Sequence, residues 1–136
     1  LRVLHPPAAA DDGDNDRSLV LQLAFGGAAV LLPGDLEAAG EAALVQRWGA
    51  RLASDVLKVP HHGSATSSSA ALLDAVAPRL AVVSAGADNR FGFPAAAIAA
   101  AYARRGIGLW RTDRDGAVTL SIGADGALHV AATRGS

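Results

Sequence analysis

Short runs of apolar residues alternate along the chain with segments of helical spacing. Runs rich in Leu and Val, each bounded by Gly, Pro or Ser, predict buried strands. The predicted strands cover residues 1–4, 18–25, 28–32, 55–59, 80–84, 109–111, 117–122 and 128–132. Apolar residues at helical spacing predict helices at 36–48 and 67–77, and an Ala-rich helix that ends at Gly106.

Turn-forming residues separate these segments. Gly26-Gly27 and residues 113–116 each predict a hairpin between the strands on either side. The acidic segment 8–16 predicts a loop. Asp35 stands just before the helix at 36–48 and is predicted to be its N-cap, because a carboxylate there can accept free backbone amides.

Strands that alternate with helices predict one α/β domain over residues 1–136, with antiparallel hairpins at its edges. Strands 28–32, 55–59 and 80–84 should be neighbours in one sheet. Helices 36–48 and 67–77 should lie on the same face of that sheet.

Composition narrows the function. Hydrophobic residues make up 51% of the chain but aromatic residues only 4%, so Ala, Val and Leu must build the core. The net charge of −1 argues against a protein that holds nucleic acid by overall charge. The absence of cysteine excludes disulfides, Cys-ligated zinc and a thiol nucleophile.

The chain shows no signal for a membrane segment. Its apolar stretches are shorter than the ~20 residues that a membrane helix needs, and no signal peptide is recognisable. The sequence starts within a predicted strand at Leu1 and contains no methionine. We therefore expect it to be part of a longer protein.

Two candidate chemical features follow directly after predicted strands. Asp35 comes after strand 28–32, and His61 and His62 come after strand 55–59. If the two strands are parallel neighbours, these side chains meet at one edge of the sheet, where ligands gather in α/β folds. A carboxylate with imidazoles is a ligand set that zinc or manganese accepts. Asp35 alone is also explained by capping, whereas adjacent histidines have no obvious packing role.

Several strings resemble, in the same order, the ComEC family of polytopic membrane proteins of natural transformation. The strings are 15–21 (NDRSLVL), 31–35 (LLPGD), 57–64 (LKVPHHGS), 83–86 (VSAG), 89–92 (NRFG) and 111–116 (RTDRDG). The resemblance covers nearly the whole chain. It implies the C-terminal half of a metallo-β-lactamase-like αββα sandwich, which in that family is one domain of a larger protein.

The resemblance also implies roles for individual residues. Asp35 would bridge two divalent metal ions, zinc or manganese, and His61 would complete one ligand set, so that both are candidate catalytic residues. His62 would either support the ligands from behind or be an alternative ligand, and His5 would be a further ligand. Lys58, Ser64, Asn15 and Asn89 are candidates for substrate binding. For Lys58 a solvated strand end is an equal alternative, and turn formation is an equal alternative for the others. We interpret His129 as structural.

Two departures from the family pattern matter. The HxHxDH-type cluster that supplies most ligands in this superfamily does not occur in the sequence, and it would lie upstream of Leu1. Related sequences often have histidine where this chain has Phe93, between Gly92 and Pro94. Both departures leave the completeness of the metal site open.

The resemblance implies hydrolysis of phosphodiester bonds in incoming DNA. Its partners would be DNA and the rest of the membrane channel, with the parent protein in the bacterial inner membrane and this domain facing outside the cytoplasm. One alternative is a non-catalytic domain that guides DNA in the same channel. Another is a lactamase or lactonase of the same fold, which the ordered ComEC-like strings argue against.

Overall fold

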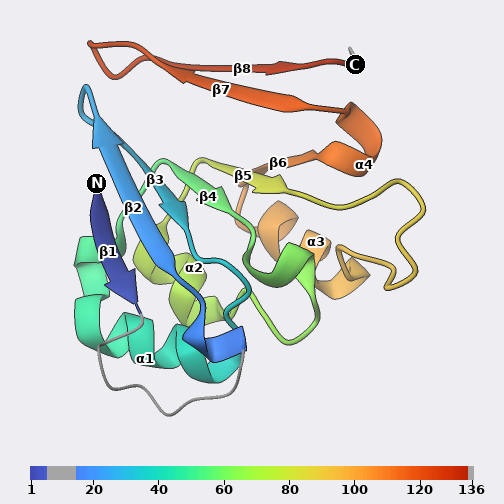
Figure 1. Cartoon of the computed structure of the whole chain (residues 1–136), viewed down its shortest axis with the longest axis horizontal. Coiled ribbons are helices and arrows are strands. Elements are labelled where there is room, and N and C mark those ends of the chain that lie inside the picture. Colours follow the sequence, from blue (N-terminus) through green and yellow to red (C-terminus); the bar gives the residue numbers. More distant parts are fainter. Residues whose placement is uncertain (6–14, 135–136) are drawn as a thin grey trace.

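The structure is a computed structural model that describes residues 1–5 and 15–134. It has a six-stranded sheet and a two-stranded sheet, and helices cover one face of the larger sheet (Figure 1). Residues 8–14 of the predicted loop 8–16 lie outside the described residues. The end of that loop is a short 3-10 turn, η1, at Asn15–Arg17.

The predicted strands and helices are all present, close to their predicted bounds. The strands are β1 Arg2–His5, β2 Val20–Phe25, β3 Ala28–Leu32, β4 Val56–Lys58, β5 Leu80–Val83, β6 Gly108–Arg111, β7 Val118–Ile122 and β8 Leu128–Ala132. The helices are α1 Ala38–Trp48, α2 Ala70–Val76, α3 Ala96–Arg104 and the short α4 Thr112–Asp115, with 3-10 turns η2 Gly49–Leu52 and η3 Pro60–Gly63.

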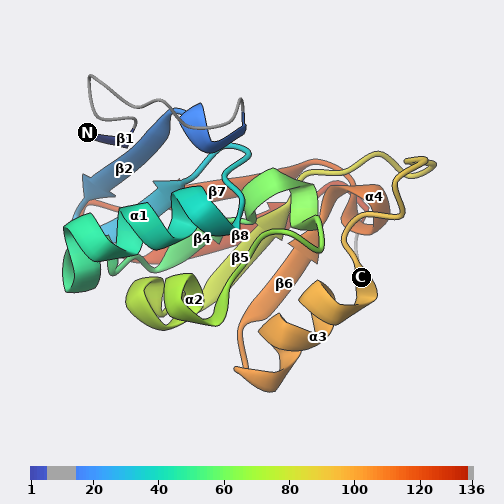
Figure 2. The same cartoon turned by 90° about the horizontal axis from the view of Figure 1, so that it is seen from below.

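The larger sheet has the strand order β1-β2-β3-β4-β5-β6. The pairs β1–β2 and β2–β3 are antiparallel, and the pairs from β3 to β6 are parallel. The three strands β3, β4 and β5 are therefore neighbours, as predicted. Helices α1 and α2 lie on the same face of the sheet, as also predicted (Figure 2). The chain is a mixed α/β domain.

Both faces of the central strands are covered. Val56 and Leu57 point to opposite faces of β4, and each is buried. One face packs against the helices, where Leu44, Leu72 and Val76 belong to the same apolar core. The β7–β8 sheet lies over the other face (Figure 1). The carboxyl ends of β3 to β5 are thus held between two layers.

The predicted hairpin between strands 109–111 and 117–122 is wrong. β6 pairs with β5 in parallel, while β7 pairs with β8. The intervening residues form α4 instead of a tight turn, because Asp115 accepts the backbone N–H of Arg111 at 2.7 Å. Thr112 also exchanges hydrogen bonds with the backbone of Ala85 beyond β5. These contacts turn the chain out of the larger sheet.

The β2–β3 turn and the β7–β8 turn contact each other through glycine. Gly26 has a φ of +58°, and a Cβ placed on it would collide with backbone atoms of Gly123 and Gly126. No other residue fits both that backbone conformation and that space. This contact attaches the small sheet to the tip of the larger one.

Candidate functional site

Asp35 lies in a turn that follows β3, and it is not the N-cap of α1. Glu37 occupies the cap position, without a hydrogen bond from its side chain to the helix. Ser18 accepts the backbone N–H of Asp35 at 3.0 Å through its Oγ. This bond and the packing of Gly34 against Ser18 hold the turn so that the Asp35 carboxylate stays about half exposed. The capping prediction failed because tertiary contacts start the helix later.

The two histidines occupy a strained segment directly after β4. His61 and His62 both have positive φ, at 44° and 55°. Side chains other than glycine rarely adopt this conformation, and it persists only where surrounding contacts impose it. Here the backbone N–H of His61 donates to the carbonyl of Gly34 at 3.1 Å, which ties the histidine loop to the Asp35 turn.

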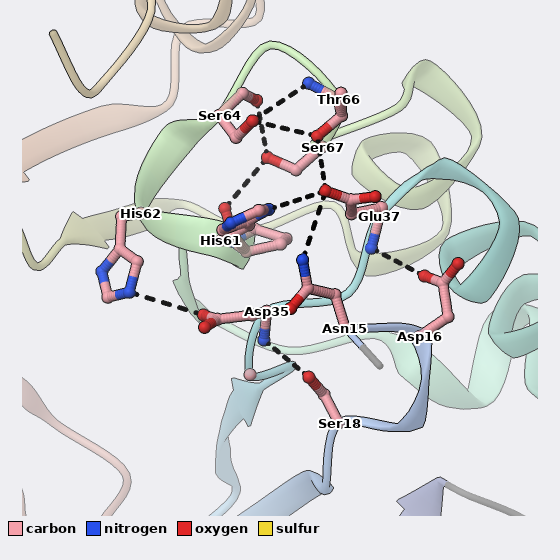
Figure 3. Close-up of polar contacts among 12 residues, drawn as sticks. Asn15, Asp16, Ser18, Asp35, Glu37, His61, His62, Ser64, Thr66 and Ser67 are labelled. Atoms are coloured by element: carbon pink, nitrogen blue, oxygen red, sulfur yellow. Dashed lines mark hydrogen bonds and ion pairs between the residues drawn. The ribbon is translucent and has the colours of Figure 1, made fainter. Parts of the chain in front are cut away.

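His62 is the histidine that meets Asp35. Its Nε2 lies 3.5 Å from Asp35 Oδ1 (Figure 3). Its Nδ1 lies 2.6 Å from the carbonyl oxygen of Ser84, and because a carbonyl only accepts, Nδ1 carries the proton. The predicted approach of a His ring nitrogen to the Asp35 carboxylate is therefore confirmed.

His61 turns instead toward Glu37, a residue that the sequence did not single out. His61 Nδ1 lies 3.1 Å from Glu37 Oε1, and the same oxygen accepts from Thr66 at 3.1 Å and from Asn15 at 3.4 Å (Figure 3). The angles at the contact between His61 and Glu37 are not those of a hydrogen bond. Within the described residues, the buried Nδ1 of His61 therefore has no hydrogen-bond partner. Glu37 therefore lies beside His61 without a hydrogen bond to it.

Ser64 belongs to the framework of the histidine loop. Its Oγ lies 2.9 Å from Thr66 Oγ1, and Ser67 donates from one hydroxyl to the carbonyls of Pro60 and Ser64. These bonds hold the loop after His62 in one shape. The role of Ser64 in substrate binding stays a prediction.

Lys58 lies beside Asp35. Its Nζ donates to the carbonyl of Gly34 at 3.3 Å and lies 3.8 Å from Asp35 Oδ1. Burial lowers the pKa of the Lys58 ammonium, and the nearby Asp35 carboxylate offsets part of that shift. The site therefore places a cation next to the carboxylate.

A cavity of about 600 Å³ opens at these residues. Its lining comprises Asp35, His61, His62, Ser84, Ala85, Gly86, Asn89, Phe91 and Phe93. Asn89 braces the loop beyond β5, since its amide bonds the backbone N–H and carbonyl of Phe93 at 2.7 and 2.9 Å. Turn formation thus accounts for Asn89, and its role in substrate binding stays a prediction.

His5 and His129 lie apart from this cavity. The Nε2 of buried His5 donates to the carbonyl of Asp16 at 2.7 Å, and His5 is not among the described residues that line the cavity. His129 is exposed on β8. Across residues 1–5 and 15–134, no three His, Cys, Asp or Glu side chains gather in a way that could hold a metal ion.

The chain is similar to parts of three longer bacterial proteins. It is 43% identical to "Competence protein ComA" of Neisseria gonorrhoeae over 90% of this chain and 18% of that protein. It is 36% identical to "ComE operon protein 3" of Bacillus subtilis over 85% of this chain and 15% of that protein. "Recombination protein 2" of Haemophilus influenzae is 40% identical over 68% of this chain and 11% of that protein. No family model matches the chain.

These relatives are much longer than this chain, which spans less than a fifth of their length. Within the described residues, no helix is both long and apolar enough to cross a membrane.

Proposed function

We propose that this chain is the C-terminal half of a metallo-β-lactamase-like hydrolase domain in a ComEC-type DNA-uptake protein. The complete domain cleaves phosphodiester bonds of incoming DNA with divalent metal, zinc or manganese. The observation that carries the proposal is the meeting of Asp35 and His62 at the carboxyl edge of the sheet, in a chain similar to competence proteins.

The chemistry of the two side chains supports a cation between them. With the proton of His62 on Nδ1, the lone pair of Nε2 faces Asp35 Oδ1 at 3.5 Å. A cation between two acceptors at this distance would turn their mutual repulsion into attraction to the cation. A histidine that donates its other ring N–H to a backbone carbonyl is the usual arrangement of a metal ligand. We therefore assign the ligand role to His62 before His61.

The described residues supply part of a metal centre. A catalytic zinc ion takes three protein ligands and one water, whereas Asp35 and His62 are two ligands. His61 is adjacent, with its Nδ1 beside Glu37. We assign the remaining ligands to an HxHxDH-type cluster upstream. When bound, such ions polarise the phosphodiester and lower the pKa of a coordinated water.

The other residues of the site prepare it for a phosphate. Lys58 presents a positive charge beside Asp35, where it can attract a phosphate oxygen as a point charge. The cavity volume of about 600 Å³ is in the range of sites that hold a nucleotide-sized ligand. In this proposal DNA and the rest of the channel are the partners. The parent protein lies in the bacterial inner membrane, with this domain outside the cytoplasm.

One observation favours a second candidate, a non-catalytic domain that guides DNA. Phe93 occupies a position where a histidine would add a ligand, and its ring packs against His61 with 6.0 Å between the ring centres. An apolar ring there gives a surface for DNA but no metal ligand. The two candidates differ in whether the full protein cleaves DNA.

The deciding experiment is a nuclease assay on the full-length protein that carries this chain, with manganese or zinc and a labelled DNA strand. We expect Asp35→Ala and His62→Ala each to reduce cleavage at least about 100-fold, because each removes a direct ligand. Asp74→Ala is the matched control. Asp74 is an exposed carboxylate on α2 that pairs with Arg105, and it does not line the cavity. Wild-type protein that binds DNA but cleaves none with either metal would support the guiding domain instead.

A further inference from the structure

The loop between β5 and α3 carries an aromatic column that leads away from the site. The ring of Phe93 meets His61 edge-on, and Phe91 stacks on Phe93 with 5.4 Å between ring centres and 18° between ring planes. The guanidinium of Arg90 lies 4.9 Å from the centre of the Phe91 ring. In Figure 1 this yellow loop projects beyond the carboxyl ends of the parallel strands.

The column is held at a fixed place relative to the histidines. Asn89 closes the loop through its bonds to the backbone of Phe93. At the other end, Ala95 donates its backbone N–H to the carbonyl of Gly63 at 2.9 Å. Gly63 packs so closely on Pro94 that a Cβ would lie 2.5 Å from the proline ring. These contacts hold the backbone around Phe93 against the loop that carries the histidines.

The exposure of the column is not explained by folding. Phe91 is 64% exposed although aromatic residues are scarce in this chain, and the structure places it at the cavity that Asp35 and His62 also line. The cavity thus has aromatic residues on one side and Asp35 and His62 on the other. This arrangement matches a nucleotide, whose base has flat apolar faces while its phosphate is charged. Exposed aromatic rings and arginine planes are the surfaces on which unpaired bases stack.

We infer that Phe91 and Phe93, continued by Arg90, form a base-stacking wall that selects unpaired single-stranded DNA at this site. The inference rests on the proposed function, because it places the phosphodiester at Asp35 and His62. A base in a duplex already has both faces stacked on its neighbours, so it gains nothing from the wall. An unpaired base next to the bound phosphate gains a stacking partner.

The test compares strands that differ only in their bases. Binding of the full-length protein is measured by fluorescence anisotropy with manganese present, on phosphorothioate-linked strands that resist cleavage and so stay intact. The probes are a thymidine strand of about 12 nucleotides, an abasic strand with the same phosphates, and a duplex. We expect Phe91→Ala to weaken binding of the thymidine strand about 5- to 150-fold, the usual range for loss of one stacked base. Binding of the abasic strand and the duplex should change little.

Two variants serve as controls. Phe91→Trp should keep the preference for the thymidine strand, because it retains an aromatic face. Phe25→Ala removes an equally exposed phenylalanine, 59% exposed, from β2 at a distance from the site and should leave binding unchanged. Thermal melting of each variant shows that it is folded.

Equal weakening of the thymidine and abasic strands by Phe91→Ala would overturn the inference, since it would mean that Phe91 supports the fold or packs on another part of the protein. An unchanged affinity for the thymidine strand would overturn it as well. Neither result would touch the proposed function if the wild-type protein still cleaves DNA and Asp35→Ala does not. Wild-type protein that binds none of the three probes and cleaves no DNA would refute both proposals.

Discussion

Glu41 is a buried acid that connects three helices. Its carboxylate on α1 accepts the backbone N–H groups of Ser68 and Ser69 at the start of α2. The hydroxyl of Tyr102 on α3 lies 3.1 Å from Ser68 Oγ in the same pocket. Burial raises the pKa of Glu41 above that of an exposed glutamate, although the bonds from Ser68 and Ser69 oppose this shift. The residue thus supplies acceptors for α2 at a place where burial disfavours its charged form.

We expect Glu41→Ala to lower the free energy of unfolding by about 2 to 5 kcal/mol, because it leaves the buried N–H of Ser68 and the partly buried N–H of Ser69 without acceptors. Glu41→Gln keeps one acceptor and should cost less. A raised pKa means that the folded state holds the proton more tightly. The stability that the fold gains from this raised pKa is therefore complete below the pKa of an unfolded glutamate, about 4.3. It is lost as the pH rises through the pKa of Glu41 in the folded state.

Urea unfolding from about pH 4 to about pH 7 checks this, and the readout is the difference in free energy of unfolding between Glu41→Gln and wild type. As the pH rises, the glutamine variant should become more stable relative to wild type. A shift in the opposite direction would mean that the bonds from Ser68 and Ser69 outweigh burial.

The elements of the fold could largely be predicted because their signals are local. Short runs of Leu and Val closed by glycine or proline gave the strands, and the places where strands end brought Asp35 and the histidine pair together. The pairing of β6 with β5 was not predicted, because it depends on contacts of Thr112 with the distant backbone of Ala85. Hydrophobic pattern says where a strand is but not which strand it joins.

The same limit applies to the candidate site. Glu37 contacts His61, Thr66 and Asn15, which lie far from it in the sequence. No spacing rule connects these positions. The only local signal was an acid two residues after Asp35, and helix capping would have explained it equally well. Which histidine faces Asp35 was likewise beyond prediction, because two positive φ angles set the ring directions.

The contact between the two hairpin turns gives a prediction for a single element. Gly26→Ala should destabilise the fold by about 1 to 3 kcal/mol more than Gly27→Ala, because a methyl group on Gly26 collides with the β7–β8 turn. Gly27 is the matched control, since it also has a positive φ but nothing lies within 4 Å of its added Cβ. Chemical denaturation of both variants gives the difference. Equal losses would show that backbone strain alone matters at this turn.

The candidate site and an exposed apolar surface lie at different edges of the domain. Val3 of the edge strand β1 is 60% exposed. Leu1 beside it is exposed too, as is Leu19, which precedes the neighbouring strand β2. Edge strands with apolar side chains favour association with another strand. In the proposed complete domain, the upstream half supplies both this cover and the missing metal ligands. Folding and metal binding then depend on the same missing partner.

This dependence predicts that the 136-residue chain by itself binds metal weakly and does not cleave DNA. Asp35 and His62 are two ligands where zinc needs three from the protein, and His5 is engaged with the backbone of Asp16. Loss of outer-shell support alone costs about 10- to 100-fold in metal affinity, and loss of direct ligands should cost more. The exposed edge should also make the chain prone to aggregate.

Calorimetric titration with zinc or manganese, followed by a nuclease assay on single- and double-stranded DNA, measures both properties of the isolated chain. We expect no binding at micromolar or tighter affinity and no cleavage. Addition of the upstream half should restore both, because it brings the remaining ligands to Asp35 and His62. If the chain alone bound zinc tightly and cut DNA, and Asp35→Ala abolished this, the site would be complete without upstream ligands. The ligand count proposed for the site would then be wrong.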